Sequence, residues 1–160
     1  METIITVATI LSMYLNASVD NKSQYFYNAD IENGQVNTMY VYDRTFDGLT
    51  PKLEYRYTYD EAERLTSKEA YAWNEESGNW ERSYKLDINY TTDGYEVERS
   101  NWDARSHAYK AVSEKAVYHY EFSGLLSVNY LRRESDSGNY QLIDQMLIMN
   151  PKNELLLAWN

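Results

Sequence analysis

Apolar and polar side chains alternate at every second residue along several stretches of this chain. The clearest stretch is Lys52–Asp60, where Leu, Tyr, Tyr and Tyr alternate with Lys, Glu, Arg and Thr. Successive side chains of a β-strand point to opposite faces, so this spacing produces one apolar and one polar face. Trp80–Tyr90 repeats the pattern, and Gln35–Asp43 puts Val36, Thr38, Tyr40 and Tyr42 on one face. The pattern predicts an all-β fold.

Turn signals separate these stretches, and one of them recurs. Glu76–Trp80 reads Glu-Ser-Gly-Asn-Trp and returns as Asp136–Tyr140, Asp-Ser-Gly-Asn-Tyr. Short connections make consecutive strands antiparallel neighbours. We expect an antiparallel meander of about ten strands, curled into an open roll or a partly closed barrel. The expected strands are 24–28, 35–43, 52–60, 65–73, 80–90, 95–102, 108–122, 125–133, 140–149 and 154–159, with 45–51 as the longest connection.

The N-terminus carries a separate signal. Ile4–Leu15 is apolar and is followed by Asn16-Ala17-Ser18, which matches the length and exit of a signal peptide although no Lys or Arg precedes it. We therefore expect residues 1–18 to be a signal peptide and residues 19–160 a single β-meander domain. The protein would then be secreted, periplasmic or on the bacterial cell surface. The alternative is a strand or helix that packs on the sheet.

Composition narrows the possible partners. The chain has 17 tyrosines and 3 phenylalanines, a net charge of −10 and no cysteine. Its basic residues are interspersed with acids, so we expect no nucleic acid partner. No disulfide is possible, and we expect no cofactor and no membrane span in the mature chain.

Two C-terminal segments are apolar on both faces. They are Tyr140–Met149 and Leu155–Trp159. An uncovered apolar edge strand is an aggregation hazard, so we expect both faces of this region to be covered. Curling of the sheet, the N-terminal segment or a second subunit could cover it, which makes a homodimer through the C-terminal strands one expectation.

Tyr57–Thr66 reads Tyr-Thr-Tyr-Asp-Glu-Ala-Glu-Arg-Leu-Thr and resembles the tyrosine–aspartate repeats of large bacterial surface proteins, with Glu63 where those repeats favour glycine. Later copies at Asn89–Gly94 and Tyr118–Gly124 are degenerate. Together with the Ser-Gly-Asn turns, the chain is similar to a family of small secreted proteins of unknown function from gut anaerobic bacteria. The resemblance implies export and a repetitive sheet, and it transfers no catalytic residue.

No catalytic motif is present in the sequence. His107 and His119 lack the further ligands of a metal site, and Asp43, Asp60 and Asp93 are expected to initiate turns rather than bind calcium. We therefore expect neither an enzyme nor a metal site.

Aromatic residues beside the turns are the candidate ligand-binding residues, because flat rings stack on sugars and anchor protein partners. They are Trp73, Trp80, Trp102, Tyr109 and Tyr140. The competing interpretation is that these rings close the ends of a thin core, which fits the register of Trp80 best. The sequence thus favours a secreted, non-catalytic module that binds a glycan or a protein through a Tyr/Trp-rich face or rim. Alternatives are a carrier of a lipid-like small molecule inside a closed barrel, and a structural surface scaffold.

Overall fold

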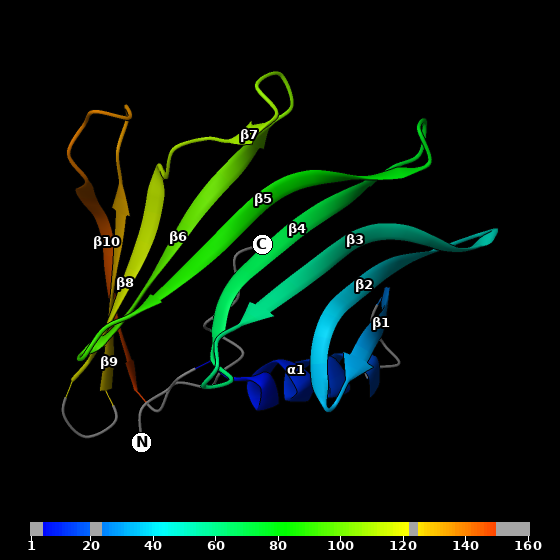
Figure 1. The fold of residues 1–160 in the computed structure, drawn as a ribbon, viewed down its shortest axis with the longest axis horizontal. Coiled ribbons are helices and arrows are strands. Elements are labelled where there is room, and N and C mark those ends of the chain that lie inside the picture. Colours follow the sequence, from blue (N-terminus) through cyan, green and yellow to red (C-terminus); the bar gives the residue numbers. More distant parts are fainter. Residues whose placement is uncertain (1–4, 20–23, 122–124, 150–160) are drawn as a thin grey trace. The chain divides into compact units, whose positions relative to one another are not determined.

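The computed structural model describes residues 5–19, 24–121 and 125–149 (Figure 1). This part of the chain contains one helix, α1 (Val7–Val19), and ten strands. The strands are β1 (Tyr25–Glu32), β2 (Gln35–Thr45), β3 (Gly48–Tyr59), β4 (Leu65–Asn74), β5 (Asn79–Tyr90), β6 (Gly94–Asp103), β7 (Ala108–Tyr109), β8 (Glu114–Tyr120), β9 (Leu125–Arg132) and β10 (Gln141–Met149).

The strands pair in sequence order. The hydrogen-bonded order is β1-β2-β3-β4-β5-β6-β8-β9-β10, with β7 paired to β6. This confirms the expected all-β antiparallel meander. Within the described strands, β1 pairs only with β2 and β10 only with β9, so the sheet has two edges and is not closed. The closed barrel that the carrier alternative requires is therefore not formed by these strands.

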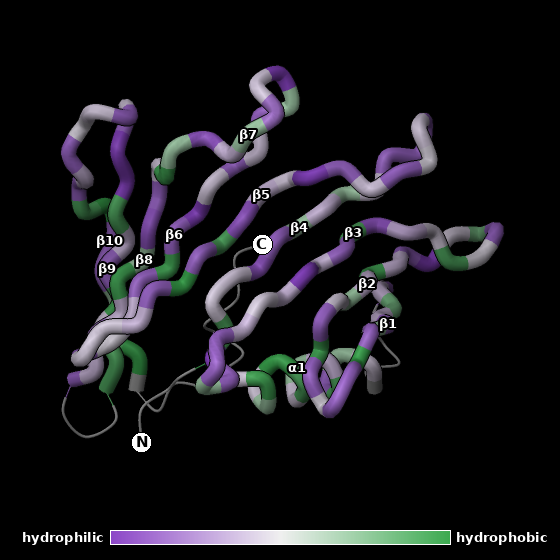
Figure 2. The backbone as a smooth tube through the Cα atoms, in the orientation of Figure 1, coloured by the Kyte–Doolittle hydropathy of each residue, from purple (hydrophilic) through white to green (hydrophobic). Residues whose placement is uncertain are grey.

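The chain divides into two compact units, and β5 runs from one into the other. The N-terminal unit is Ile5–Tyr84, and the described residues from Lys85 onward belong to the C-terminal unit. Figure 2 shows hydrophilic and hydrophobic residues alternating along the strands of both units. In the N-terminal unit the buried apolar residues are Ile5, Ile10, Val36, Met39, Val41, Leu65, Ala70 and Tyr71. In the C-terminal unit they are Leu86, Ile88, Tyr95, Val97, Ala116, Tyr118, Leu126 and Val128.

Three irregularities correct the expected strands. The connection expected at 45–51 is a tight hairpin in which Thr45 pairs with Gly48, and Pro51 lies at a register shift, where a strand tolerates its missing N–H. Asn37 is bypassed by the β1–β2 pairing, so Val36 is buried with Met39 rather than sharing a face with Tyr40.

The third irregularity divides the strand expected at 108–122 into β7 and β8. Between these strands the Val112 carbonyl accepts hydrogen bonds from side chains, from Arg133 Nε at 2.6 Å and from Tyr140 Oη at 2.9 Å. Side chains thus take the place of a neighbouring strand at this carbonyl.

The described part of the N-terminal segment is a packed helix. Thr6 and Thr9 cap it reciprocally, because each hydroxyl accepts from the other residue's backbone N–H, at 3.2 and 3.4 Å. Leu65 N donates to Ile5 O at 2.8 Å, Ile5 and Ile10 are buried, and α1 packs on β1 and β2. A helix packed on the sheet is the alternative that we gave to a signal peptide. Signal cleavage and export remain predictions. Within the described residues, no helix is both long enough and apolar enough to cross a membrane.

Within the described residues of a single chain, the expected cover over β10 is not present. Leu142, Ile143 and Leu147 are 52–64% exposed, and Met146 is 39% exposed. β10 is also an edge strand that pairs with β9 alone, so its outer backbone groups have no partner strand among the described residues. The strand expected at 154–159 lies outside the described residues. A second subunit over β10 stays a prediction.

Candidate binding face

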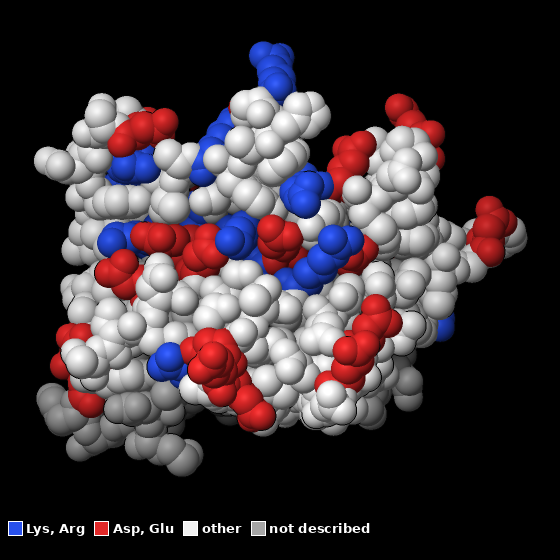
Figure 3. All heavy atoms as spheres, viewed as in Figure 1, with Lys and Arg blue, Asp and Glu red and all other residues white. Residues whose placement is uncertain are grey.

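One face of the N-terminal unit presents two polar rows that cross four strands. Register places Asn28, Tyr40, Glu54 and Tyr71 directly opposite one another in the first row. The second row consists of Asp30, Thr38, Arg56 and Glu69. Residues two apart in a strand share a face, so the rows are neighbours. Figure 3 shows acidic and basic side chains interspersed on the face in view.

The charged groups of these rows are already paired with one another. Arg56 Nε donates to Oε1 of Glu54, whose side chain is 4% exposed. The Arg56 guanidinium also lies 4.2 Å from the Tyr71 ring centroid and donates to Tyr71 Oη at 3.2 Å. Tyr71 Oη in turn donates to Glu69 Oε2 at 2.7 Å. Burial raises the pKa of Tyr71, and Glu69 raises it further because its carboxylate accepts a hydrogen bond from the Tyr71 hydroxyl.

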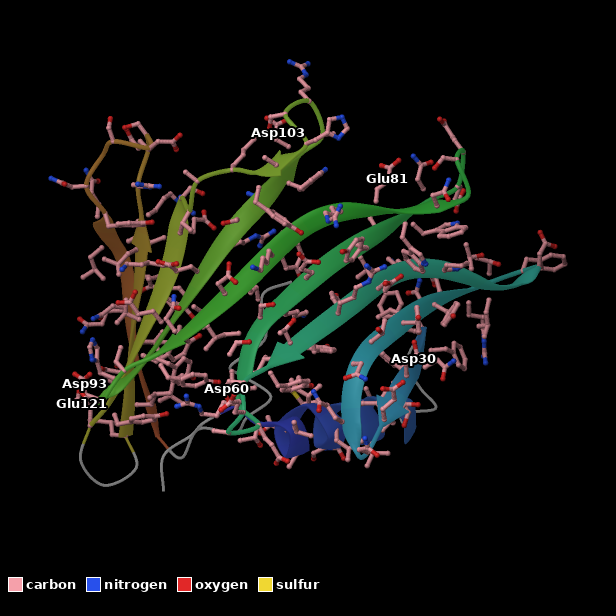
Figure 4. The ribbon with its side chains drawn as sticks, viewed as in Figure 1. Asp30, Asp60, Glu81, Asp93, Asp103 and Glu121 are labelled. Atoms are coloured by element: carbon pink, nitrogen blue, oxygen red, sulfur yellow. The ribbon has the colours of Figure 1, made fainter. Side chains whose placement is uncertain are left out.

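An aromatic cluster borders these rows near the β4–β5 hairpin. The rings of Trp73 and Trp80 meet edge to face, with centroids 5.1 Å apart, and Tyr40 lies 6.4 Å from Trp80. Tyr40 Oη donates to Asp30 Oδ2 at 2.9 Å. Burial and this hydrogen bond raise the pKa of Tyr40 to about 12. Figure 4 labels Asp30 on β1 and Glu81 on β5, and Glu81 accepts from Asn74 Nδ2 at 2.7 Å.

We call this surface the aromatic–charged face, formed by Tyr40, Glu54, Arg56, Glu69, Tyr71, Trp73 and Trp80. All three rings of its aromatic cluster are half-buried, so each keeps an accessible surface. The turn-flanking signal of the sequence identified Trp73 and Trp80. It missed Tyr40, Arg56 and Tyr71, because only strand register brings them together.

The other predicted site residues lie in the C-terminal unit and form two separate contacts. Trp102 on β6 pairs with Tyr109 on β7, and their rings meet edge to face at 5.0 Å. Tyr140 precedes β10 and packs under two cations, Arg133 at 5.3 Å and Lys115 at 5.1 Å from its ring centroid. Tyr140 therefore stabilises the 110–113 segment, where its hydroxyl donates to Val112 O, and no sequence signal distinguishes it from the turn-flanking tryptophans.

On the opposite face of the N-terminal unit, a lysine lies beside two tyrosines. Tyr55 and Tyr57 on β3 point to this face, and Lys68 on β4 pairs with Tyr57. Lys68 is 7% exposed, and its ammonium lies 3.8 Å from the Tyr55 ring centroid. Burial lowers the pKa of Lys68 to about 8. In the structure Lys68 is in register with the apolar tyrosine face of β3, and a lysine at such a position is the sequence signal that could have identified it.

The acidic and histidine residues have local contacts. Asp60 Oδ1 accepts from the backbone N–H groups of Ala62 and Arg64 at 3.0 and 2.9 Å, and the Arg64 side chain and backbone lower the pKa of Asp60. Asp60 therefore initiates a turn, as expected (Figure 4). Asp93 lies 3.5 Å from His119 Nδ1. Asp43 lies within β2 instead, where it pairs with Lys52 at 3.5 Å. No group of three metal-ligating side chains occurs in the described ranges.

Comparison with known proteins gives a family and a fold. The model of a family of unknown function, DUF3836, matches residues 1–121. A solved protein of unknown function from Bacteroides fragilis is similar, with 25% identity and a TM-score of 0.70 over 81% of this chain and 95% of that one. A DUF3836 protein from Bacteroides vulgatus is 25% identical, with a TM-score of 0.53 over 54% of this chain and 89% of its own. No curated protein matches the chain. The likeness to tyrosine–aspartate repeats stays a prediction.

Proposed function

The chain belongs to the DUF3836 family of unknown function, and we propose that it is a non-catalytic module that binds a glycan on the aromatic–charged face. The observation that carries this proposal is the cluster of Tyr40, Trp73 and Trp80, which adjoins Arg56 and Glu69 on the same side of the sheet.

The rings suit the apolar faces of sugar units. The rings of Trp73 and Trp80 pack against each other, with centroids 5.1 Å apart and planes at 70°. This contact restricts both side chains before a ligand binds, which lowers the entropic cost of binding. A flat sugar ring can stack on either accessible indole surface. A surface fixed before the ligand arrives binds with a smaller entropic cost.

The charged rows suit sugar hydroxyls. Arg56 is half-exposed, with 50% of its side-chain surface accessible, and it offers planar N–H donors beside the rings. Glu69 offers acceptor oxygens two residues from Tyr71 on the same strand. Arg56 is ion-paired with Glu54, and Glu69 is hydrogen-bonded to Tyr71. Side chains engaged in this way support ligand recognition rather than acid–base catalysis.

A glycan array with the full chain tests the proposal, followed by calorimetry with the glycans that bind. Trp73→Ala and Trp80→Ala should each weaken binding about tenfold, the equivalent of one stacked ring. Phe46→Ala is the matched control, because Phe46 is fully exposed at the β2–β3 hairpin, away from this face. Unchanged affinity in both tryptophan variants would overturn the proposal. A blank array followed by capture of a protein through the same residues would replace the glycan with a protein ligand.

We also propose that the protein is exported to the periplasm, the cell surface or the medium. The apolar run before Asn16-Ala17-Ser18 supports this proposal. N-terminal sequencing of the chain recovered from expressing bacteria tests it, since export by signal cleavage requires a new N-terminus near residue 19.

A further inference from the structure

Lys68 is a buried cation without a counter-ion among the residues that the structure describes. It is 7% exposed, and no carboxylate of the described ranges forms an ion pair with it. Burying an ammonium group is costly unless a partner compensates its charge. A position of this kind calls for an anion from elsewhere.

Two other lysines that lie over tyrosine rings show what is missing at Lys68. Lys52 lies 4.5 Å from the Tyr25 centroid and has Asp43 at 3.5 Å. Lys115 lies 5.1 Å from the Tyr140 centroid and has Glu96 at 3.1 Å. Both therefore combine a ring with a carboxylate. Lys68 has the closest ring of the three, at 3.8 Å, and no carboxylate of the described residues forms an ion pair with it.

The groups around Lys68 can hold an anion. Among the described residues, only the Tyr95 hydroxyl and Asn129 Oδ1 are fully enclosed and lack a hydrogen bond. The Lys68 ammonium is not one of these atoms, so it retains some contact with solvent. Tyr57 lies directly opposite on β3, and its hydroxyl makes no hydrogen bond within the described residues. The Cβ atoms of directly paired residues lie about 5 Å apart, so Tyr57 is the cross-strand neighbour of Lys68 and adds a second hydrogen-bond donor for an acceptor group bound there.

We propose that Lys68 and Tyr57, with the Tyr55 ring beneath the ammonium, form a binding site for the carboxylate of an acidic ligand. One ammonium neutralises one negative charge, so a singly charged carboxylate fits better than a phosphate dianion, which would leave a net buried charge. The site lies on the face opposite the aromatic–charged face, because Tyr57 and Lys68 alternate with Arg56 and Glu69. It is therefore independent of the proposed glycan site.

Binding should follow the charge of Lys68 between neutral and moderately alkaline pH; the facing tyrosines are Tyr55 and Tyr57, and Tyr84 is hydrogen-bonded to Tyr55. The pKa of Lys68 is lowered to about 8 by burial. Burial raises the pKa values of the facing Tyr55 and Tyr57 hydroxyls well above their ordinary range, so these groups stay protonated. Carboxylate affinity should then fall about tenfold per pH unit above the Lys68 pKa.

Titration of the full chain with acetate, followed by NMR of ¹⁵N-labelled lysine side chains, tests the site. We expect a saturable shift of the Lys68 signal, a rise of the Lys68 pKa in acetate, and at least tenfold weaker binding of the dianionic form of inorganic phosphate. Lys52 is the internal control, because Asp43 already occupies its ammonium. Lys68→Met should abolish the acetate effect, Tyr57→Phe should weaken it several-fold, and Trp73→Ala should leave it unchanged.

Three results would overturn the proposal. They are a Lys68 signal that acetate does not saturate, an equal shift at Lys52, and acetate binding that persists in Lys68→Met. The Tyr57→Phe titration reads the Lys68 signal directly, so it decides the question even if Lys68→Met fails to fold. Loss of glycan binding in Trp73→Ala with intact acetate binding separates the two sites.

Discussion

Arg56 covers a buried carboxylate: its Nε donates to Glu54 Oε1, and the Glu54 side chain is 4% exposed. Removing the cation leaves that charge buried without compensation. Arg56→Met should destabilise the fold by about 2 kcal/mol, less than for a fully buried pair because half of the Arg56 side chain is solvent-screened. Urea unfolding measures the change. The double variant Glu54→Met/Arg56→Met should recover most of the loss, and a single variant as stable as the wild type would contradict the prediction.

Tyr95 carries an enclosed hydroxyl that has no hydrogen-bond partner within the described ranges. Its ring is fully buried and stacks on Tyr118, with centroids 4.4 Å apart. Tyr95→Phe keeps the stacking and removes the unsatisfied group, so it should stabilise the fold by about 1 kcal/mol. Tyr59→Phe is the matched control and should destabilise by a similar amount, because Tyr59 Oη donates to Val36 O at 2.9 Å. The prediction is refuted if the urea unfolding midpoints of Tyr95→Phe and Tyr59→Phe both rise or both fall relative to the wild type.

Lys68 gives a pH-dependent stability with a defined sign. Its folded pKa, about 8, lies below the ordinary value of 10.5, so the unfolded chain holds the proton more tightly. The cost of the buried charge is therefore present in full below pH 8 and is relieved as pH rises from 8 to 10.5. Lys68→Met should stabilise the fold by about 3 kcal/mol at neutral pH, and this gain should shrink in alkali. Urea unfolding of both proteins across that interval measures the difference, and a gain independent of pH would contradict it.

Trp102 and Tyr109 hold the two-residue strand β7 against β6. Trp102→Ala should cost about 1 kcal/mol of local stability, because one cross-strand aromatic pair is lost. Faster amide hydrogen exchange at Lys110, whose N–H donates to Asn101 O at 2.9 Å, reports this loosening. Glycan affinity should not change, since this pair is not part of the aromatic–charged face. Reduced affinity would show that Trp102 also contacts the ligand.

The exposed β10 edge predicts self-association. Leu147 is 64% exposed, and the strand has no lysine, arginine or proline to discourage pairing. We predict a homodimer through β10, which Leu147→Lys should convert to a monomer in analytical ultracentrifugation. Ile31→Lys on the opposite edge strand β1 is the control, with Ile31 42% exposed. A monomeric wild-type protein would exclude the dimer.

Alternation in the sequence predicted the strands and their faces wherever pairing is regular. Tyr55 and Tyr57 indeed share one face of β3 and Arg56 the other. The prediction failed where one residue is bypassed, because each bulge exchanges the two faces beyond it. This happened at Asn37, which moved Val36 into the core. Nothing in a local pattern reports where such a residue falls.

The candidate site was predictable only where its residues are close in sequence. Trp73 and Trp80 flank one hairpin, so their contact follows from the turn between them. Tyr40 joins them from β2, and Arg56 reaches Tyr71 from β3, through registers that depend on the whole sheet. Within the described residues Lys68 has no ion-pair partner, and a local stretch of sequence does not show this because it depends on which side chains the fold brings near.

The packing of α1 has a consequence for the export proposed above, because cleavage would remove part of the core. Ile5 and Ile10 are completely buried, and the backbone before α1 is bonded to Leu65. A chain cut after Ser18 would have to close its N-terminal unit without them, and would be the less stable of the two forms. Under that proposal, the segment that is later cleaved would stabilise the folded precursor before export. Export would therefore depend on how quickly the secretion machinery engages the nascent chain.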